Sequence, residues 1–273
     1  MSGELCVFDI ETIPDVSVLH SLTGSETSSI AEMRKELEDY HVRISKNGNP
    51  FPRQLFHRIV SISLIRAVIR SKNGCEYYEL ERIGTLSSRD KTEQQIVESF
   101  FSYFYGHSPR IVGYNSKTFD LPVLKYRAMK YAVPTKKQFA FNNRWENYNS
   151  KYSLKWHCDL LEALSDFGMS ARCKMTEVCS VLDIPGKIDG MDGSKVTDLF
   201  DSGNIEELDN YCETDVISTY LIYLNYALLS GLVGRDDFMA MNRDLIHYLE
   251  NKRKNNFDRF LSEWKKLDSK GIF

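Results

Sequence analysis

Two acidic residues interrupt an apolar run at the start of the chain. Residues 5–12 read LCVFDIET, and apart from Asp9 and Glu11 this run has the composition of a buried strand. Residues i and i+2 of a strand point to the same face, so the two carboxylates project together from one side of a sheet. Burying two like charges without partners is costly. The pair therefore requires either a divalent cation or a strand end at which both acids face solvent.

The overall composition is that of an ordinary globular protein. The 273 residues, 42% hydrophobic and 27% charged, allow one large domain or two small ones. A net charge of -3 argues against a strongly basic nucleic-acid-binding protein but leaves local patches open. The six cysteines have no C-x-x-C spacing, which predicts the reduced thiols of a cytoplasmic protein.

No membrane segment is expected. The N-terminal apolar run is short and broken by acids, so it does not predict a secretory signal. The most apolar segment, residues 220–233, is too short to span a bilayer and contains Asn225 and Ser230. It predicts a buried core helix.

Strand and helix patterns alternate through the first half of the chain. Alternating β-branched residues predict a strand at residues 59–69, and Asn73-Gly74 predicts a hairpin turn into a second strand at residues 76–83. This alternation of strands and helices predicts an α/β fold around a mixed sheet. The further expected elements are a helix at residues 92–105 with Thr92 as N-cap, a strand at 110–114, a turn at 115–119, and helices at 120–131, 160–167, 174–182, 195–201 and 205 to about 232.

Two segments lie outside this alternation. Residues 14–52 are polar, Ser-rich and charged, with a short helical pattern near residues 30–40, and we interpret them as an insertion over the sheet edge. Residues 236–267 predict an amphipathic helix or helix pair that packs on the body. The apolar stripe of this tail consists of Phe238, Met241, Leu245, Leu249, Phe257, Phe260, Leu261 and Trp264.

Two further acids occupy positions that suit a binding site. Asp120 lies where a predicted strand gives way to a helix, and open α/β sheets place ligands at such strand ends. Helix N-capping is the alternative role for this residue. Asp215 follows Tyr211 by four residues, so both face the same way on a helix. That helix is largely apolar, so Asp215 is either solvent-facing or recruited to a site.

Taken together, the four acids predict a metal site. Asp9, Glu11, Asp120 and Asp215 come from three separate elements. Carboxylates without a His or Cys cluster favour Mg²⁺ or Mn²⁺ over zinc. Four acids are about what two ions ~4 Å apart require for in-line attack on a phosphodiester.

These motifs resemble, in order, the three exonuclease motifs of the DEDD superfamily. The first is FDIET at residues 8–12, the second runs from Tyr114-Asn115 through Phe119-Asp120, and the third is Tyr211-x-x-x-Asp215. More specifically, the chain resembles the stand-alone predicted 3′-5′ exonucleases related to the exonuclease domain of family B DNA polymerases. The resemblance runs from Leu5 to about Tyr226 and leaves the tail beyond Gly234 outside. It also rests on HCDLL at residues 157–161, PGK at 185–187, GMDGSKV at 190–196 and YCE at 211–213.

The resemblance implies an α/β, RNase H-like mixed sheet flanked by helices, with a C-terminal helical extension. It implies that Asp9, Glu11, Asp120 and Asp215 bind two Mg²⁺ or Mn²⁺ ions and that Tyr211 orients the attacking water. The histidine variant of the family has His five residues before the last acid; position 210 is Asn, so the tyrosine variant (DEDDy) is indicated. A tyrosine with an ordinary pKa near 10 orients water rather than deprotonating it at neutral pH.

The expected domain organisation follows from the same resemblance. Residues 1–233 form the exonuclease domain, with the insertion at about residues 14–57, and residues 234–273 form the amphipathic helical tail. This tail is the expected surface for a protein partner or a second copy of the chain.

Several residues are candidates for contact with substrate. The motif positions of Asn115 and Phe119 imply an approach to the terminal nucleotide, although a turn side chain and a core aromatic are their alternative roles. Residues 117–195 hold 13 Lys/Arg against 9 Asp/Glu, an excess that suits phosphates. Residues 186–193, with Lys187, form a glycine loop that could touch phosphate but lacks the Walker pattern. Most of the interleaved aromatics are expected in the core and one or two are expected to stack on bases: Phe139, Phe141, Trp145, Tyr148, Tyr152 and Trp156.

Three other polar residues have competing interpretations. Asp159 is either a fifth acid near the metals or the N-cap of the helix at residues 160–167. His157 and His57 are expected to be structural rather than catalytic.

The expected function is a metal-dependent 3′-5′ exonuclease that acts on a single-stranded end, and DNA is the expected substrate. One rival is an exoribonuclease or oligonucleotide trimmer on the same scaffold, because contacts to the 2′-OH depend on pocket shape. The other is a catalytically silent nucleic-acid-binding module, against which the complete set of acids argues.

Overall fold

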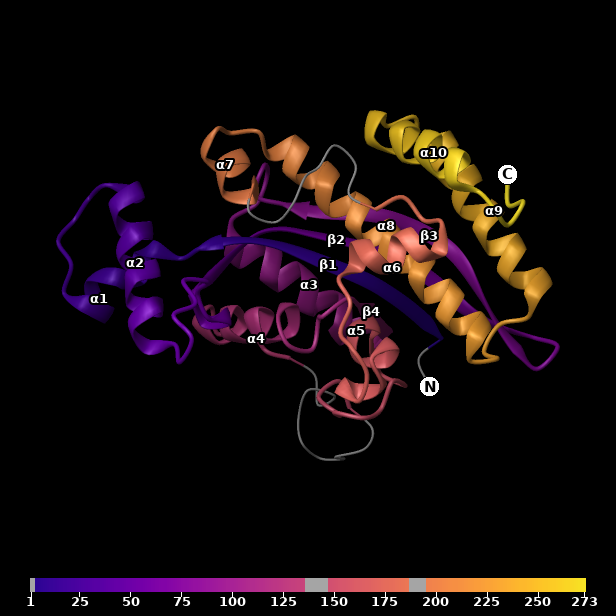
Figure 1. Cartoon of the computed structure of the whole chain (residues 1–273), viewed down its shortest axis with the longest axis horizontal. Helices are drawn as coiled ribbons and strands as arrows, with labels where there is room; N and C mark the ends of the chain where they lie inside the picture. The colour runs from indigo at the N-terminus through magenta and orange to yellow at the C-terminus, as the bar shows by residue number, and fades with distance from the viewer. Residues whose placement is uncertain (1–2, 136–146, 187–194) are drawn as a thin grey trace.

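The computed structural model describes residues 3–135, 147–186 and 195–273. A five-stranded mixed sheet in the order β3-β2-β1-β4-β5 forms its centre, with helices on both faces (Figure 1). β1, β2 and β3 pair antiparallel, whereas β4 pairs parallel with both β1 and β5. This is the α/β, RNase H-like architecture that the motifs implied. The strands are β1 (Glu4–Pro14), β2 (His57–Lys72), β3 (Cys75–Ser87), β4 (Arg110–Gly113) and β5 (His157–Asp159).

The predicted helices are confirmed, with shifts at their ends. The helix expected at residues 160–167 ends at Leu164, because Asp166 and Phe167 adopt positive φ angles of 48° and 57°. The short strand β5 was not predicted, since three residues cannot show a period-two pattern. The helices are α1 (Leu19–Thr23), α2 (Ile30–Ile44), α3 (Glu93–His107), α4 (Asp120–Lys130), α5 (Leu160–Leu164), α6 (Met175–Leu182), α7 (Val196–Asp201), α8 (Ile205–Leu229), α9 (Arg235–Lys252) and α10 (Asn255–Leu267).

β1 contributes alternate side chains to two separate cores. Leu5 and Val7 pack in the core shared with α8, α9 and α10. Phe8 and Ile10 pack on the opposite face, in the core shared with α3 and α4. Because side chains alternate along a strand, Asp9 and Glu11 continue the Leu5–Val7 series. The acidic pair therefore lies on the face of the sheet that α8 covers.

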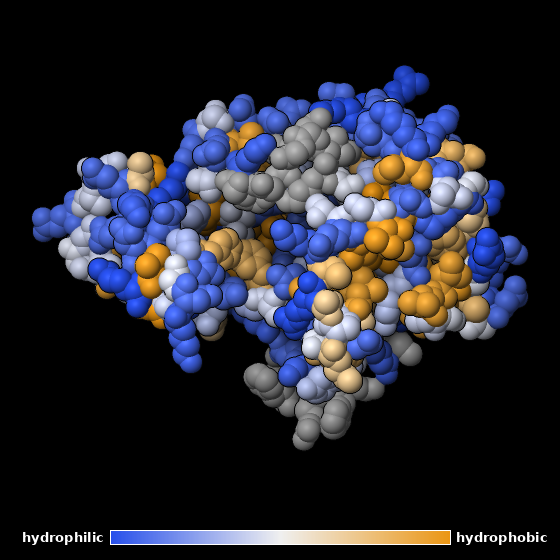
Figure 2. Space-filling model, in the orientation of Figure 1, coloured by the Kyte–Doolittle hydropathy of each residue, from blue (hydrophilic) through white to orange (hydrophobic). Residues whose placement is uncertain are grey.

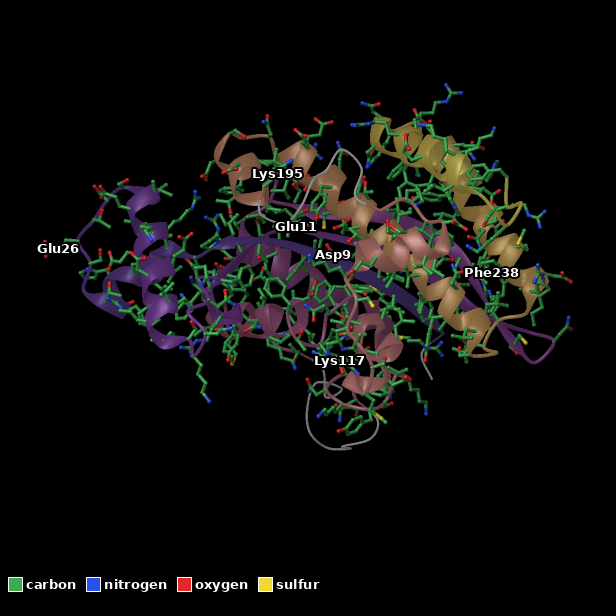
Figure 3. The ribbon with its side chains drawn as sticks, viewed as in Figure 1. Asp9, Glu11, Glu26, Lys117, Lys195 and Phe238 are labelled. Carbon is green, nitrogen blue, oxygen red and sulfur yellow. The ribbon has the colours of Figure 1, made fainter. Side chains whose placement is uncertain are left out.

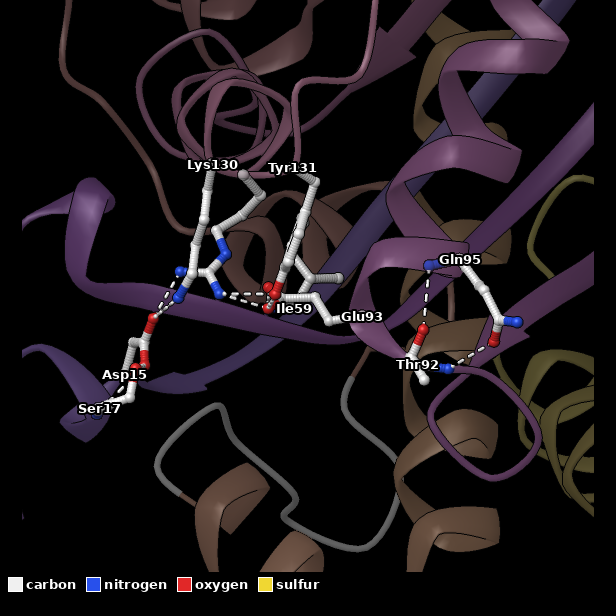
Figure 4. A network of polar contacts seen from close by, with 9 residues as sticks. Asp15, Ser17, Ile59, Thr92, Glu93, Gln95, Lys130 and Tyr131 are labelled. Carbon is white, nitrogen blue, oxygen red and sulfur yellow. Dashed lines mark hydrogen bonds and ion pairs between the residues drawn. The ribbon is translucent and has the colours of Figure 1, made fainter.

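The predicted hairpin turn and the predicted helix cap are both present. Asn73 and Gly74 both have positive φ, 53° and 82°, which is the geometry of a two-residue hairpin turn between β2 and β3. Thr92 caps α3 and forms a full capping box with Gln95, seen at the right of Figure 4.

The insertion forms a small unit at the C-terminal end of β1. Figure 1 places α1 and α2 beyond the end of this central strand rather than over an edge strand of the sheet. Leu19, Leu37 and Phe56 form a small core of their own. The unit is fastened to the body by a hydrogen bond from Gln54 Nε2 to the carbonyl oxygen of Thr118, 2.9 Å long.

The C-terminal tail packs against the body as expected. α9 and α10 lie along α8 and β3 (Figure 1), and seven of the eight residues of the apolar stripe are buried. They belong to the same core as α8, so the tail is continuous with the main body. Among the described helices, none combines the length and the apolar character that crossing a membrane requires. All six cysteines are free thiols.

A buried ion network fixes the end of β1 against α4. Arg127 of α4 donates to Asp15, 2.6 Å away, and to Glu93 of α3. Glu93 also accepts a hydrogen bond from the backbone N–H of Ile59 in β2, 2.7 Å long (Figure 4). Burial alone would raise the pKa of Asp15, but hydrogen bonds from Ser17 and Arg127 outweigh it and lower the pKa to about 2. The network therefore joins the strand that carries Asp9 and Glu11 to the helix that carries Asp120.

Replacing Arg127 should destabilise the protein strongly. Arg127→Met leaves the buried Glu93 carboxylate without a counter-charge and Asp15 with only the half-exposed Lys130. Breaking such a buried pair typically costs about 3–5 kcal/mol of unfolding free energy. Lys130→Met is the matched control, because Lys130 is 42% exposed and its ion pair with Asp15 should contribute less than about 1 kcal/mol. Urea denaturation measures both variants. Equal losses in the two would contradict a central role for Arg127.

Candidate metal centre and its two cavities

The four acids predicted from sequence converge on one site. Asp9 and Glu11 lie side by side in the middle of the sheet (Figure 3), and their oxygens lie within 4.8 Å of each other and of the Cys212 sulfur. Asp120 and Asp215 are close enough to Asp9 to raise the pKa of its carboxyl group. Glu11, Asp120 and Asp215 are each no more than 7% exposed, and Asp9 is partly exposed.

Burial and mutual repulsion disfavour the ionised form of this cluster. Burial, followed by the charges of Asp120, Glu11 and Asp215, raises the pKa of Asp9 well above its ordinary value. Burial raises the pKa of Asp120 to about 7. A divalent cation would reverse both effects, because it favours the carboxylate form of every acid that surrounds it.

The chemistry of the donor atoms suits a hard cation. Cys212 lies beside the acids, but burial and then the charges of Asp9 and Glu11 raise the pKa of its thiol well above the ordinary value. In the metal-free protein the thiol is therefore protonated, and it donates to the Asp9 backbone oxygen, 3.6 Å away. Because carboxylate oxygens outnumber this one sulfur among the converging groups, the donor set suits a hard cation such as Mg²⁺ or Mn²⁺.

Asp120 reaches the site because β4 is short. β4 pairs with β1 only from Leu5 to Val7, so beyond that point none of the described strands pairs with this edge of β1. The Asp120 carboxylate accepts a hydrogen bond from the Ile10 N–H on this open edge. Phe119 occupies the N-cap position of α4, so the alternative that Asp120 is the N-cap is wrong.

Asp159 organises the turn that precedes Asp120. Its carboxylate accepts three backbone hydrogen bonds, from Asn115 (2.9 Å), Lys117 (2.7 Å) and Leu161 (3.0 Å). The predicted N-cap role is thus confirmed, and both carboxylate oxygens are occupied by the turn rather than directed to the metal site.

The same turn requires glycine at position 113. A Cβ atom at Gly113 would lie 2.5 Å from Ser116 Oγ, which is itself bonded to His157 Nε2 over 2.8 Å. Burial lowers the pKa of His157 to about 3, so the ring is neutral. His157 is a buried structural residue, as expected.

α8 brings Tyr211 and Asp215 to the site on one helical face. The Tyr211 hydroxyl donates a hydrogen bond to the Asp215 carboxylate, and burial, followed by the charges of Asp215, Glu11 and Asp9, raises the pKa of the phenol far above its ordinary value. The hydroxyl is therefore neutral throughout the physiological pH range. Asp215 is 7% exposed, so the solvent-facing alternative is wrong.

The tail fastens α8 through Glu213, which lies between Tyr211 and Asp215. The Glu213 carboxylate is 3% exposed. It accepts from Lys254 (2.7 and 3.0 Å), Asn256 (3.1 Å) and Thr85 of β3 (3.0 Å). The junction of α9 and α10 therefore helps to fix the helix that carries the third motif.

Two cavities flank the acids. A cavity of about 620 Å³ adjoins Asp9 and Asp215, and a cavity of about 420 Å³ adjoins Glu11. Asn115, whose φ of 62° shapes the turn, lines the larger one, and Phe119 lines the smaller one. The other residues around the larger cavity are Tyr114, Leu161, Arg172, Cys173, Lys174, Met175 and Thr176.

Several contributors to the site were not predicted. Cys212 was missed although it is three residues before Asp215, a spacing that places both on one side of a helix. For Arg172 and Lys174, the only signal in the sequence was the general excess of Lys and Arg over Asp and Glu in residues 117–195. Of the aromatics proposed to stack on bases, Tyr148 is buried in the core and Tyr152 is 61% exposed. Phe139, Phe141, Trp145 and most of the glycine loop at residues 186–193 lie outside the described residues.

Comparison with known proteins identifies the family of the chain. A family described as "Predicted 3'-5' exonuclease related to the exonuclease domain of PolB" matches residues 49–264. The match begins after Asp9 and Glu11 and extends through most of the tail, so it is displaced at both ends from the resemblance noted between Leu5 and about Tyr226. No curated protein matches the chain.

In the metal-free protein, Asp120→Asn should raise the melting temperature at pH 8 by several degrees. The pKa of Asp120 is raised in the folded state, so its favourable contribution is complete below about pH 4 and is lost as the pH rises to about 7. Asparagine keeps the shape without the charge. Thermal melts in EDTA at pH 5 and pH 8 measure the effect, which should be small at pH 5.

Glu26→Gln is the matched control for this experiment. Glu26 is exposed in the insertion, far from the acids in Figure 3. A lower melting temperature for Asp120→Asn at pH 8, or a gain equal to that of the control, would contradict an electrostatically strained site.

Proposed function

Because the chain belongs to the family of predicted 3′-5′ exonucleases related to the PolB exonuclease domain, we propose that it removes nucleotides from the 3′ end of single-stranded DNA. The observation that carries this proposal is the convergence of four carboxylates from β1, α4 and α8 beside a neutral tyrosine. The products would be nucleoside 5′-monophosphates.

The proposed cofactors are two Mg²⁺ or Mn²⁺ ions held by Asp9, Glu11, Asp120 and Asp215. Besides burial, the charges of all three other acids raise the pKa of Asp9, which supports a central, shared position for its carboxylate. When bound, such ions supply an activated water and neutralise charge on the phosphate and on the leaving oxygen. Both tasks suit hydrolysis of a phosphodiester.

Tyr211 is proposed to position the attacking water. Its hydroxyl is held by Asp215, one of the proposed ligands, so it lies beside the place where a water would be activated. Its raised pKa keeps it neutral and therefore a hydrogen-bonding group rather than a general base. The proposed role of Tyr211 is therefore only to orient the attacking water.

The two cavities suggest how a strand would lie. Lys174 and Arg172 line the larger cavity together with Asp9 and Asp215. Cationic side chains there would meet the phosphates that precede the scissile bond. Asn115 in the same cavity and Phe119 in the smaller one are proposed to contact the terminal nucleotide on either side of the acids.

A digest of labelled oligonucleotides tests the proposal. We expect a 5′-labelled single-stranded DNA 20-mer to give a ladder of shortening products, and a 3′-labelled one to release mononucleotide at once, with Mg²⁺ or Mn²⁺ and not with EDTA. Asp215→Asn should lower the rate by ~10³-fold, since ion binding stabilises such transition states by several kcal/mol. Glu26→Gln should retain the wild-type rate.

A matched RNA 20-mer in the same assay decides between the DNA and RNA alternatives. Faster cleavage of RNA would replace DNA as the proposed substrate. Absence of product from either polymer with either metal would favour the silent binding module.

Tyr211→Phe should lower kcat by roughly 10²-fold, the scale of a lost positioning contact, without weakening Mn²⁺ binding measured by calorimetry. Because the wild-type phenol does not ionise, the pH–rate profiles of the two proteins between pH 7 and pH 10 should have the same shape. Loss of an alkaline limb in the variant would show that Tyr211 acts as a base.

A further inference from the structure

An exposed aromatic pair lies on the lobe around α5, outside both cavities. The rings of Tyr152 and Phe167 meet nearly edge to face, with their centroids 5.4 Å apart. Tyr152 is 61% exposed and Phe167 is half-buried. In Figure 2 this lobe, at the lower centre, shows hydrophobic surface beside hydrophilic surface. Core packing therefore does not account for the position of Tyr152.

A lysine ties Tyr152 to the turn of the second motif. Lys117 Nζ donates to the carbonyl oxygens of Lys151 (3.3 Å) and Ser153 (3.5 Å), the two neighbours of Tyr152 in the chain. The backbone N–H of Lys117 bonds to the Asp159 carboxylate in the turn that leads to α4. Lys117 accordingly lies at the edge of the α5 lobe (Figure 3). The segment that carries Tyr152 is therefore fixed relative to the metal centre.

The turn that carries Phe167 is strained. Asp166, Phe167 and Gly168 have successive positive φ angles of 48°, 57° and 88°, and the first two are not glycines. Surrounding contacts hold this backbone in place, among them a hydrogen bond from the Gly168 N–H to the carbonyl oxygen of Ser165, 2.9 Å long. Strain of this kind is concentrated at functional and ligand-binding sites.

Arg172 joins the aromatic pair to the larger cavity. A Cβ atom at Gly168 would lie 3.8 Å from Arg172 Nη2, so the guanidinium group packs against the turn that carries Phe167. Arg172 is also paired with Glu162 of α5, whose side chain is 9% exposed. The same arginine lines the larger cavity together with two of the four acids. The aromatic pair therefore adjoins the cavity that leads to the metal centre.

Cationic side chains surround the aromatic pair. Lys151 Nζ lies 5.1 Å from the centroid of the Tyr152 ring, and Arg172 and Lys174 lie toward the cavity. The exposed Asp166 offsets one of these charges. Burying the cations under an apolar protein surface would be costly. A single-stranded nucleic acid instead offers phosphates to the cations and unpaired bases to the rings, which is how sequence-independent binding of single strands works.

We propose that Tyr152, supported by Phe167, stacks on an unpaired base that lies 5′ of the scissile phosphodiester. This assignment rests on the proposed nuclease function and adds a strand contact outside the cavities proposed for the terminal nucleotide and its neighbouring phosphates. A strand long enough to reach Tyr152 gains a stacking contact that a dinucleotide lacks. The substrate class is therefore a single strand of several nucleotides, and not the short fragments on which an oligonucleotide trimmer acts.

Binding of strands of different length tests the aromatic pair without requiring cleavage. Unlabelled dT strands displace a fluorescein-labelled dT 12-mer from the Asp215→Asn protein in Mg²⁺, and anisotropy gives their Kd. We expect Tyr152→Ala to raise the Kd of the 12-mer by about tenfold, as a lost stacking contact predicts, and to leave that of a dinucleotide unchanged. Tyr152→Phe keeps the ring and should bind as the parent does.

Tyr105→Ala is the matched control. Tyr105 is also 61% exposed, but it belongs to α3, which covers the other face of the sheet, and it lines neither cavity. This variant should bind both strands as the parent does. Equal losses of 12-mer binding in the Tyr105 and Tyr152 variants would overturn the proposal.

An abasic scan of the 12-mer locates the stacked base. In the parent protein, removing one base 5′ of the scissile bond should weaken binding by about the same factor as Tyr152→Ala. At that position the Tyr152→Ala protein should lose nothing further. If Tyr152→Ala binds every probe as the parent does, or if every abasic site has the same effect in both proteins, Tyr152 is not the stacking residue.

Turnover separates this proposal from the proposed function. In the otherwise wild-type protein, Tyr152→Ala should raise the KM for the 12-mer by about tenfold and leave kcat unchanged, because the ring touches no reacting atom. Cleavage with an unaltered KM would support the nuclease and refute the stacking role. Tyr152-dependent binding by a protein that cleaves nothing would support the stacking role and refute the nuclease.

Discussion

Repulsion among buried carboxylates is the constraint on which the site depends. Asp9, Glu11, Asp120 and Asp215 disfavour one another's ionised forms, so the fold must hold them together against that repulsion. Well-packed elements do this. α8 is buried along nearly its whole length, and β1 is enclosed between two apolar cores. The rigid frame holds this arrangement in spite of the repulsion, which the proposed cations would relieve.

Three buried polar contacts keep the frame in place. Arg127 joins the end of β1 to α4 and α3, Asp159 holds the turn before Asp120, and Glu213 ties α8 to the tail. Each fixes an element that carries one of the acids. None of these residues faces the metal site, and yet each sets the position of a side chain that does. Stability and site geometry therefore depend on the same interactions.

Much of this arrangement could be predicted from the sequence, because much of it is local. The i, i+2 spacing of Asp9 and Glu11, the i, i+4 spacing of Tyr211 and Asp215, and the Asn73-Gly74 turn each report on a few neighbouring residues. The remainder depends on contacts between distant segments. The Asp120 carboxylate accepts a hydrogen bond from the Ile10 N–H instead of capping its helix. The Phe51 ring contacts the rings of His57 and Phe119 only when the insertion has packed against the body. Such contacts leave no periodic pattern in the sequence.

The central claim is that these four carboxylates form one site for two divalent cations. Anomalous X-ray diffraction from crystals soaked in Mn²⁺ tests it most directly. We predict two Mn²⁺ peaks about 4 Å apart, both within bonding distance of Asp9 and each ligated in addition by at least one of Glu11, Asp120 and Asp215. Mn²⁺ peaks located only elsewhere on the protein, or no peak at saturating Mn²⁺, would contradict the account.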